Sequence, residues 1–209
     1  MTANNLSRAL QCERAVSTAA LDLVFRLRYE CYHRRGAIPA NCEQRFSDSF
    51  DTLPNHFSFL LRGPEQAAVG TVRISVVRPD IGWADAPSCR VFGDDESFRR
   101  IALHPFVEAS RLCFGRQARR DVLYRLLATL VAMADLHQAR WLVACPRVEH
   151  SHIYQRLFGF KPIAPPRQYF GVSFATELLA VPLAEIRETA AAHKSMSHAW
   201  TEAAKVVLA

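Results

Sequence analysis

The sequence contains no hydrophobic run of about 18–20 residues, so no segment is expected to span a membrane as a helix. Residues 1–20 are mixed polar and lack the apolar core of a secretory signal peptide. These two absences favour a cytoplasmic location. Of the 209 residues, 50% are hydrophobic and 22% are charged, a composition that suits a folded domain and excludes global disorder.

Sequence motifs for metals and nucleotides are also missing. None of the six cysteines forms a C-x-x-C pair, and no Cys/His spacing resembles a zinc site, so no metal is expected. Cys113 and Cys145 lie in apolar stretches, where a small buried thiol is the simpler interpretation and a nucleophilic Cys113 the alternative. The sequence has neither G-x-G-x-x-G nor a Walker loop, which removes support for dinucleotide or nucleoside triphosphate binding.

Positive charge is in excess, with a net charge of +6. A basic surface suits nucleic acid, an anionic membrane or an acidic protein, although a solvated face is the alternative for any one cluster. No helix-turn-helix, zinc finger or RNA-binding aromatic motif accompanies the arginines, so no nucleic-acid partner is expected. The clusters are Arg34-Arg35, Arg99-Arg100, and Arg116, Arg119 and Arg120.

Hydrophobic periodicity predicts an α/β domain with a mixed sheet flanked by helices. Residues 1–20 are expected to form a flexible lead-in, residues 21–183 the domain, and residues 184–209 a C-terminal helix. Residues 37–54 and 79–107 are expected to be a long loop and a long insert. Helices are predicted at 21–32, 121–137 and 149–158, and strands at 56–61, 68–77, around Leu112, at 141–145 and within 172–183, the first two strands forming an antiparallel hairpin.

Charged residues stand beside one apolar strand in the segment from Glu108 to Phe114. Strand alternation predicts that Glu108 and Ser110 face one side and Arg111 the other. Charged side chains at the end of a buried strand cost free energy unless they form ion pairs or take part in catalysis or binding. Together with Asp48, Asp51 and Arg73 they form either a catalytic constellation or a structural ion-pair network.

Four short motifs follow one another along the chain: Arg28-Tyr29-x-x-Tyr32, Asp48-x-Phe50-Asp51, Gly70-Thr71-Val72-Arg73 and Glu108-x-Ser110-Arg111. The element order, with Tyr154-x4-Gly159-Phe160 after the second central strand, resembles the GCN5-related N-acyltransferase (GNAT) fold. The motif series resembles the acyl-homoserine-lactone synthases and, more closely, the long-chain N-acyl amino acid synthases of the FeeM type. The lactone-synthase tryptophan after the first helix is missing, and residues 165–172 look more like the amino acid branch.

The resemblance implies an acyl group delivered as a thioester on the 4'-phosphopantetheine of acyl carrier protein, with no bound cofactor. The acceptor would be the α-amine of an amino acid such as tyrosine. The alternatives are a lactone synthase, a coenzyme A-dependent acetyltransferase and a non-catalytic module that binds acyl groups or carrier protein. No glycine follows Gly115 in the stretch to Asp121, which disfavours a close approach to the pyrophosphate of coenzyme A. Arg116, Arg119 and Arg120 are therefore expected to bind an acidic carrier protein.

The chemistry of amide formation assigns expected roles, with Glu108 chosen because the strand edge can hold it near the cleft. Glu108 is the candidate proton acceptor, and Asp48, Asp51, Arg73 and Arg111 are the other catalytic candidates. Backbone amides near Leu112 to Phe114 would meet the oxyanion, and Phe114, Trp141 and Val143 would line the acyl chain. Tyr154 either protonates the thiolate or only packs its helix onto the sheet. The expected substrate-binding residues are Arg28, Ser110, Leu112, Cys113, Phe114, Ala144 and Tyr154.

Overall fold

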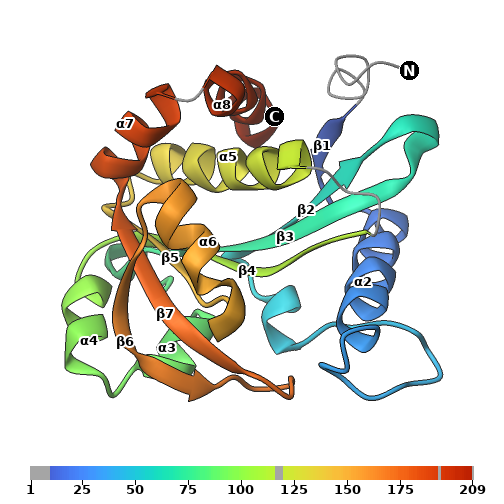
Figure 1. Ribbon diagram of the computed structural model, residues 1–209, viewed down its shortest axis with the longest axis horizontal. Helices are drawn as coiled ribbons and strands as arrows, with labels where there is room; N and C mark the ends of the chain where they lie inside the picture. Colours follow the sequence, from blue (N-terminus) through green and yellow to red (C-terminus); the bar gives the residue numbers. More distant parts are fainter. Residues whose placement is uncertain (1–9, 116–119, 193, 209) are drawn as a thin grey trace.

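The computed structural model describes residues 10–115, 120–192 and 194–208. In these residues seven strands form one sheet in the order β1-β2-β3-β4-β5-β7-β6 (Figure 1). Neighbouring strands are antiparallel, except for the parallel pair β4 and β5. The strands are β1 (Gln11–Arg14), β2 (His56–Arg62), β3 (Ala68–Val77), β4 (Phe106–Phe114), β5 (Trp141–Ala144), β6 (Lys161–Gln168) and β7 (Ala175–Pro182).

The helices flank this sheet, so the predicted α/β fold is confirmed. They are α2 (Thr18–His33), α3 (Pro87–Phe92), α4 (Glu96–Ala102), α5 (Arg120–Leu136), α6 (Val148–Phe158), α7 (Leu183–Ala192) and α8 (Lys194–Leu208). Short 3-10 turns are η1 (Ser49–Thr52), η2 (Pro64–Gln66) and η3 (Pro79–Ile81).

Two groups of helices cover the two faces of the sheet (Figure 1). Val107 and Leu142 belong to the core under α5 and α6, whereas their neighbours Phe106 and Val143 belong to the core with α3 and α4. This alternation is what a strand buried on both faces requires. Helix α2 packs against β2, β3 and β4, and α8 packs on α5 as an outer layer.

Local sequence signals explain several boundaries. The Ser17 hydroxyl accepts a hydrogen bond from the amide of Ala20 at 3.1 Å and so caps α2. Gly159 ends α6 with a φ of 72°, which glycine adopts without strain. The predicted hairpin is confirmed as the antiparallel pair β2 and β3.

Two terminal predictions need correction. The lead-in, residues 1–20, contains strand β1 and the start of α2, because Gln11–Arg14 pair with the edge of β2. This pairing depends on a partner more than forty residues away, and β1 has no periodicity of its own. The C-terminal helix, predicted as one element over 184–209, consists of the two helices α7 and α8.

Two internal predictions were incomplete. The insert at 79–107 contains α3 and α4 rather than only irregular structure. Strand β6 was missed because Pro162, Pro165 and Pro166 argue against a strand. It lies at the edge of the sheet with two register irregularities, the setting in which prolines are tolerated.

None of the helices in the described part of the chain combines the length and the hydrophobicity that crossing a membrane would require.

Candidate active site

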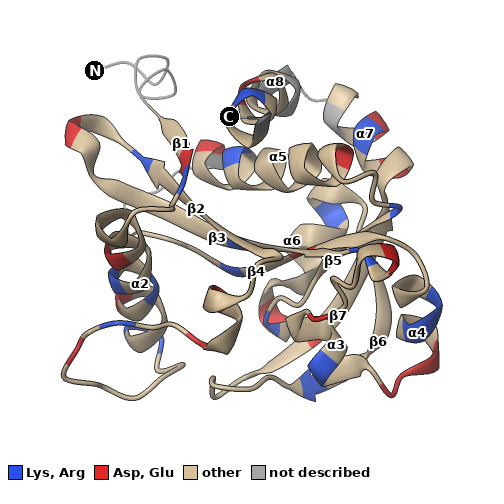
Figure 2. Cartoon of the chain, turned by 180° about the vertical axis from the view of Figure 1, so that it is seen from behind, with Lys and Arg blue, Asp and Glu red and all other residues tan. Residues whose placement is uncertain are grey.

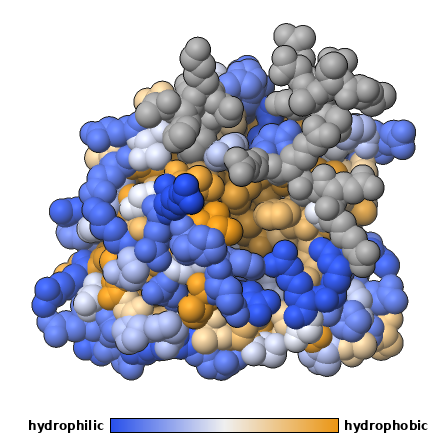
Figure 3. Space-filling model, viewed as in Figure 1, coloured by the Kyte–Doolittle hydropathy of each residue, from blue (hydrophilic) through white to orange (hydrophobic). Residues whose placement is uncertain are grey.

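A cavity of about 270 Å³ opens where β4 and β5 separate. The two strands are paired only from Phe106↔Trp141 to Ala109↔Ala144, and β4 then continues alone to Phe114. Beyond Ala144 the chain leaves through Cys145 and Pro146 towards α6. We call this space the splay cavity. Figure 3 shows a hydrophobic hollow near the centre of the molecule with a hydrophilic rim.

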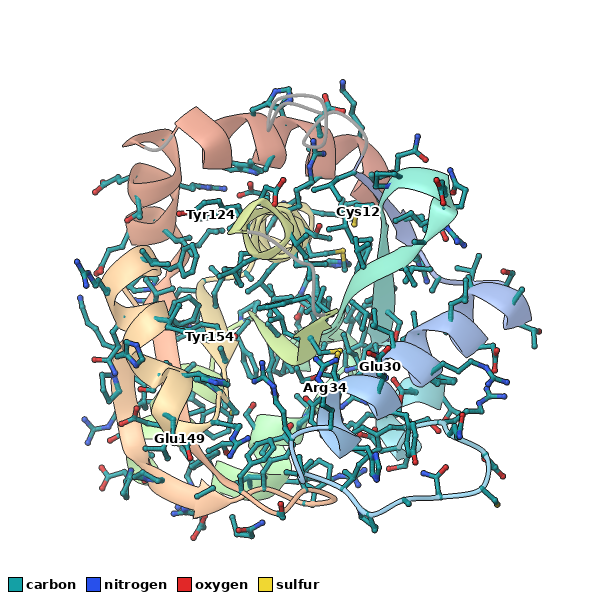
Figure 4. All side chains as sticks on the ribbon, turned by 45° about the vertical axis from the view of Figure 1, so that its right-hand side comes forward. Cys12, Glu30, Arg34, Tyr124, Glu149 and Tyr154 are labelled. Carbon is teal, nitrogen blue, oxygen red and sulfur yellow. The ribbon has the colours of Figure 1, made fainter. Side chains whose placement is uncertain are left out.

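The lining of the splay cavity comes from both faces of the sheet. Cys31 and Tyr32 belong to α2, whereas Leu123 belongs to α5 and Ile153 and Tyr154 to α6. Figure 4 shows Tyr154 on α6 and Arg34 on α2 on opposite sides of the opening. Six predicted substrate-binding residues line it: Ser110, Leu112, Cys113, Phe114, Ala144 and Tyr154.

Two lining predictions are wrong, and one predicted substrate-binding residue lies outside the lining. Val143 and Trp141 do not line the splay cavity, because they pack in the cluster formed with α3 and α4. Arg28 is fully buried beside Asp51 and Ser58 and also lies outside the lining. Residues that the sequence prediction missed are Arg35, Arg147, His150, Tyr169, Phe174 and Thr176.

A bulge in β4 changes the side on which Arg111 lies. Ser110 pairs with Arg73 and Cys113 with Thr71, so β4 has one extra residue between these pairs. Arg111 takes up the irregularity with a φ of 52°. The guanidinium of Arg73 contacts Ser110, and both Arg73 and Arg111 contact Asp48. The predicted opposite orientation of Arg111 is therefore wrong: Ser110 and Arg111 reach the same site.

Three arginines and two aspartates form a buried ion-pair network. The Arg73 Nη1 to Asp48 Oδ1 distance is 2.5 Å, and Arg111 Nη2 lies 2.7 Å from Asp48 Oδ2. Asp51 Oδ1 accepts from Arg28 at 2.8 Å and lies 3.2 Å from Arg73. Figure 2 shows basic positions within the central strands, where most of the sheet is uncharged. The network fixes the 37–54 loop against the sheet.

The spacing of the two aspartates has a local cause. Asp48 precedes η1 and accepts from the amide of Phe50 at 3.0 Å, while the Asp51 carboxylate accepts from the amide of Asp48 at 3.0 Å. This reciprocal capping box fixes both carboxylates side by side. Burial by itself would raise the pKa of each aspartate, but the neighbouring arginines hold both pKa values below the usual range.

Aromatic rings surround the Arg111 guanidinium. Its Cζ lies 4.5 Å from the ring centre of Phe46 and 5.6 Å from that of Tyr169, with Tyr32 and Phe170 slightly farther away. Such rings stabilise a cation that has lost most of its water. With Asp48 they hold Arg111 as a fixed part of the cavity wall.

Glu108 is fully buried and does not line the splay cavity. Its Oε2 accepts from the amide of Ser88 at 2.9 Å and from the Ser88 hydroxyl at 2.6 Å. Burial raises the pKa of Glu108 to about 7, although these hydrogen bonds and Arg73 oppose the rise. Ser88 was not predicted, because nothing in the sequence connects the insert with β4.

Tyr154 lines the cavity and also packs edge-on against Phe158 and Phe160, at centroid distances of 6.5 and 5.8 Å. Burial raises the pKa of its phenol. The packing prediction is thus confirmed in geometry, and the proton-donor role stays a prediction. Arg116 and Arg119 lie outside the described residues, as does the side chain of Arg120 at the start of α5.

Among the residues that the structure describes, no group of histidine, cysteine, aspartate and glutamate side chains is arranged to hold a metal ion.

Comparison with known proteins gives the family. The sequence profile of the family described as N-acyl amino acid synthase FeeM matches residues 23–182. The chain belongs to this family. As a FeeM-family protein it is an N-acyltransferase, although no curated protein matches its sequence significantly.

Solved structures share the FeeM-family fold. The structure of FeeM, an N-acyl amino acid synthase from uncultured soil microbes, is 17% identical with a TM-score of 0.70, covering 86% of this chain and 94% of FeeM. The AHL synthase LasI is 15% identical with a TM-score of 0.61, covering 86% of this chain and 92% of LasI. BjaI, a CoA-dependent acyl-homoserine lactone synthase, is 15% identical with a TM-score of 0.59, covering 91% and 98%.

Proposed function

We propose that this protein transfers a long-chain fatty acyl group from acyl carrier protein to the α-amine of an amino acid, with tyrosine as the first acceptor to test. The observation that carries the proposal is the splay cavity, whose apolar walls cross the sheet beside a fixed arginine–carboxylate network. Such a space suits a fatty chain, and the network beside it suits a polar acceptor.

The thioester carbonyl would lie along the free edge of β4. Beyond Ala109 this edge has no pairing with β5, so backbone amides there are available to the carbonyl oxygen. Preorganised amides stabilise the negative charge that develops when an amine attacks the carbon. The acyl chain would extend past Leu112, Phe114 and Ala144, which line the cavity.

Glu108 is the proposed acceptor of the amine proton. A carboxyl with a pKa of about 7 is half ionised near neutral pH, the range in which a general base is most effective. Asp48 and Asp51 are strongly ionised and engaged with arginines, so neither is free to take a proton. Their proposed role, with Arg28, Arg73 and Arg111, is to hold the site in shape.

The proposed donor carries its acyl group on 4'-phosphopantetheine, which arrives with the carrier protein as part of the substrate. The absence of glycine between Gly115 and Asp121 supports this donor over coenzyme A. BjaI is described as CoA-dependent, so the shared fold suits either donor. The two donors therefore have to be compared directly.

The deciding experiment incubates the purified protein with lauroyl or palmitoyl carrier protein and each amino acid, followed by mass spectrometry. The proposal predicts an N-acyl amino acid whose formation is faster with the carrier-protein donor than with the matching acyl coenzyme A. A lactone formed only with S-adenosylmethionine would contradict the acceptor, and exclusive use of acyl coenzyme A would contradict the donor. Absence of any acylated product would contradict acyl transfer to amines.

Ionic strength gives a separate test of the donor. The net charge of +6 should attract an acidic carrier protein, and salt screens that attraction. We expect kcat/KM for acyl carrier protein to fall about tenfold between about 0.05 M and about 0.3 M salt. The uncharged donor acyl pantetheine serves as the control and should lose far less. Equal salt dependence of both donors would argue against charge pairing with a carrier protein.

A further inference from the structure

The wall of the splay cavity has an excess of positive charge. Among the described residues that line it, three are arginines, Arg35, Arg111 and Arg147, and none is an aspartate or a glutamate. Arg111 is already paired with Asp48, which is not part of the lining. A ligand in the cavity would therefore meet the positive charges of Arg35 and Arg147, and an anionic group is the chemistry that such a wall attracts.

Arg35 and Arg147 approach the opening from opposite sides. Arg35 comes shortly after the end of α2, and Arg147 directly precedes α6 (Figure 4). Both charges act on His150, which also lines the cavity. Burial and, after it, the charges of Arg35 and Arg147 lower the pKa of the His150 imidazole. The three basic side chains therefore share one opening.

Contacts with the protein hold Arg147 in place but leave it able to bind a ligand. Its Cζ lies 4.6 Å from the ring centre of Phe174, which also lines the cavity. Its Nε has no hydrogen-bond partner in the described part of the chain, although the Glu149 carboxylate lies 3.3 Å away. The Glu149 side chain is 65% exposed, and an ion pair to so exposed a group contributes little. A ligand can therefore bind Arg147 without breaking a strong ion pair.

Two buried hydroxyl groups lie in the same part of the wall. Thr176 is 1% exposed and Tyr169 is 5% exposed, and both line the cavity. Neither hydroxyl has a hydrogen-bond partner among the residues that the structure describes. A buried hydroxyl without a partner costs free energy. A ligand that accepts a hydrogen bond from each of them would remove this cost.

Strand pairing brings the two hydroxyl groups and Arg147 together. Arg147 lies directly opposite Thr176 in an isolated antiparallel bridge. The Tyr169 amide donates to the Phe174 carbonyl oxygen at 3.5 Å, so these two residues also lie opposite each other. Phe174 and Thr176 are two positions apart and share one face. Tyr169 and Thr176 are therefore diagonal neighbours, within the reach of an aromatic side chain.

These groups match a carboxylate. The guanidinium only donates hydrogen bonds, the hydroxyls can donate, and an ionised carboxylate only accepts. A phosphate also accepts, but the phosphate of 4'-phosphopantetheine stands at the far end of the arm from the thioester. The α-carboxylate of an amino acid is bonded to the same carbon as the reacting amine. It therefore has to lie inside the cavity, whose volume is only about 270 Å³.

We propose that Arg147, Thr176 and Tyr169 form a subsite that binds the α-carboxylate of the acceptor and orients its amine towards the thioester. The proposal rests on the proposed function and narrows its substrate class to free α-amino acids. An amine without a carboxylate would leave Arg147 and the two hydroxyls without a partner, and a site built to hydrogen-bond one group rejects analogues that lack it.

The test compares an acceptor with the same molecule lacking its carboxylate. Tyrosine and tyramine are the first pair, and any amino acid that is acylated faster replaces tyrosine, together with its own decarboxylated amine. The wild type should show a kcat/KM about 100-fold higher for the amino acid than for the amine. Arg147→Met should lower kcat/KM for the amino acid by about 10- to 100-fold, mainly through KM, and leave that for the amine unchanged.

A second variant and a matched control accompany this comparison. Thr176→Val keeps the shape of the side chain, removes its hydroxyl and should lower kcat/KM for the amino acid by about tenfold. Arg156→Met removes an exposed arginine of α6 that does not line the cavity, and it should keep the wild-type preference. KM for the acyl donor should be the same in every variant, and thermal unfolding checks that each one folds.

Two kinetic results would overturn the carboxylate subsite. In Arg147→Met, the amino acid and the amine could be affected equally, or KM for the acyl donor could rise while KM for the amino acid stays constant. The second result would assign Arg147 to the donor instead. In both cases an N-acyl amino acid formed by the wild type would still support the proposed function.

Binding measured without turnover separates the two proposals in the other direction. Calorimetric titration with the amino acid, in the absence of donor, should give a Kd about 10- to 100-fold weaker for Arg147→Met than for wild type. If wild type bound the amino acid in this Arg147-dependent way but formed no acylated product, the proposed function would be contradicted and the subsite supported. If wild type showed neither binding nor product, both would be contradicted.

Discussion

Asp48 connects three parts of the molecule through one carboxylate. It caps η1 through the amide of Phe50, and it binds Arg73 of β3 and Arg111 of β4. The two arginines are 0% and 3% exposed in their side chains, so they have little water to replace this partner. The position of the 37–54 loop therefore depends on Asp48, together with Asp51, which pairs with Arg28 and Arg73.

Replacement of Asp48 by Asn should be severely destabilising. It removes the charge that pairs with buried Arg111 and one of the two charges that pair with buried Arg73, and uncompensated buried charge costs about 3–5 kcal/mol. The free energy of unfolding, measured with urea, should fall by that amount. Asp22→Asn is the matched control, since Asp22 pairs with Arg26 and Arg45, which both remain accessible to water, and its effect should stay within about 0.5 kcal/mol. Similar losses in both variants would contradict the compensating role of Asp48.

Glu108 should make stability depend on pH. Its pKa rises from 4.5 to about 7 on folding, so the folded state favours the protonated form. The stabilisation from this preference is complete below about 4.5 and is lost as pH rises through about 7. Relative to wild type, Glu108→Gln should gain on the order of 3 kcal/mol between about pH 4 and about pH 9. Urea unfolding at several pH values measures the free energy of unfolding of both proteins. If the difference between them did not change with pH, the pKa of Glu108 would not be raised.

Elements differ in how far sequence could predict them. The hairpin, α5, β5 and the end of α6 at Gly159 carry local periodicity or a turn residue, and the structure has each of them. The bulge at Arg111 carries no such signal. A left-handed backbone at a residue other than glycine costs about 1–2 kcal/mol, and its compensation by Asp48 comes from 63 positions away.

The candidate site was predicted only in part, because local sequence signals do not reveal contacts between distant segments. The motif residues from 108 to 114 were identified, and most of them line the splay cavity. Ser88 was missed because its contact with Glu108 exists only after β4 has been placed beside α3. Tyr169 was missed because it reaches the cavity through the connection between β6 and β7. The spacing of residues along the chain does not predict such contacts.

The separation of β4 from β5 should control acyl chain length. Ala144 is 2% exposed and lines the cavity where the strands part. Ala144→Leu adds volume there and should shift the preferred donor towards octanoyl, whereas Phe114→Ala removes volume and should shift it towards palmitoyl. Competition among donors, read by mass spectrometry, measures the preference. A shift in the same direction for both variants would show that the cavity does not hold the chain.

At the scale of the whole molecule, α8 packs against the outer side of α5. Ala128 and Ala132 of α5 meet Ala199 and Ala203 of α8, and all four are buried. Small side chains let the two helices approach closely. Helix α8 thus belongs to the packed structure of the domain.

Enlarging this contact should therefore destabilise the protein. Ala203→Leu overpacks the interface and is expected to cost about 1–3 kcal/mol in the free energy of unfolding. Ala191→Leu, on an exposed position of α7, is the control and should be close to neutral. Thermal and urea unfolding provide the comparison. If the interface variant were as stable as the control, α8 would not be firmly docked on α5.

The bulge in β4 reverses which residues of the strand face each side of the sheet. Before it, Ser110 contacts Arg73 of the ion-pair network; after it, Leu112 and Phe114 pack with the α5 core and Cys113 packs with α2. Deleting one residue here would exchange the two faces for everything that follows. When family members are aligned, a one-residue gap near Arg111 therefore signals a different cavity wall, even where the flanking letters agree.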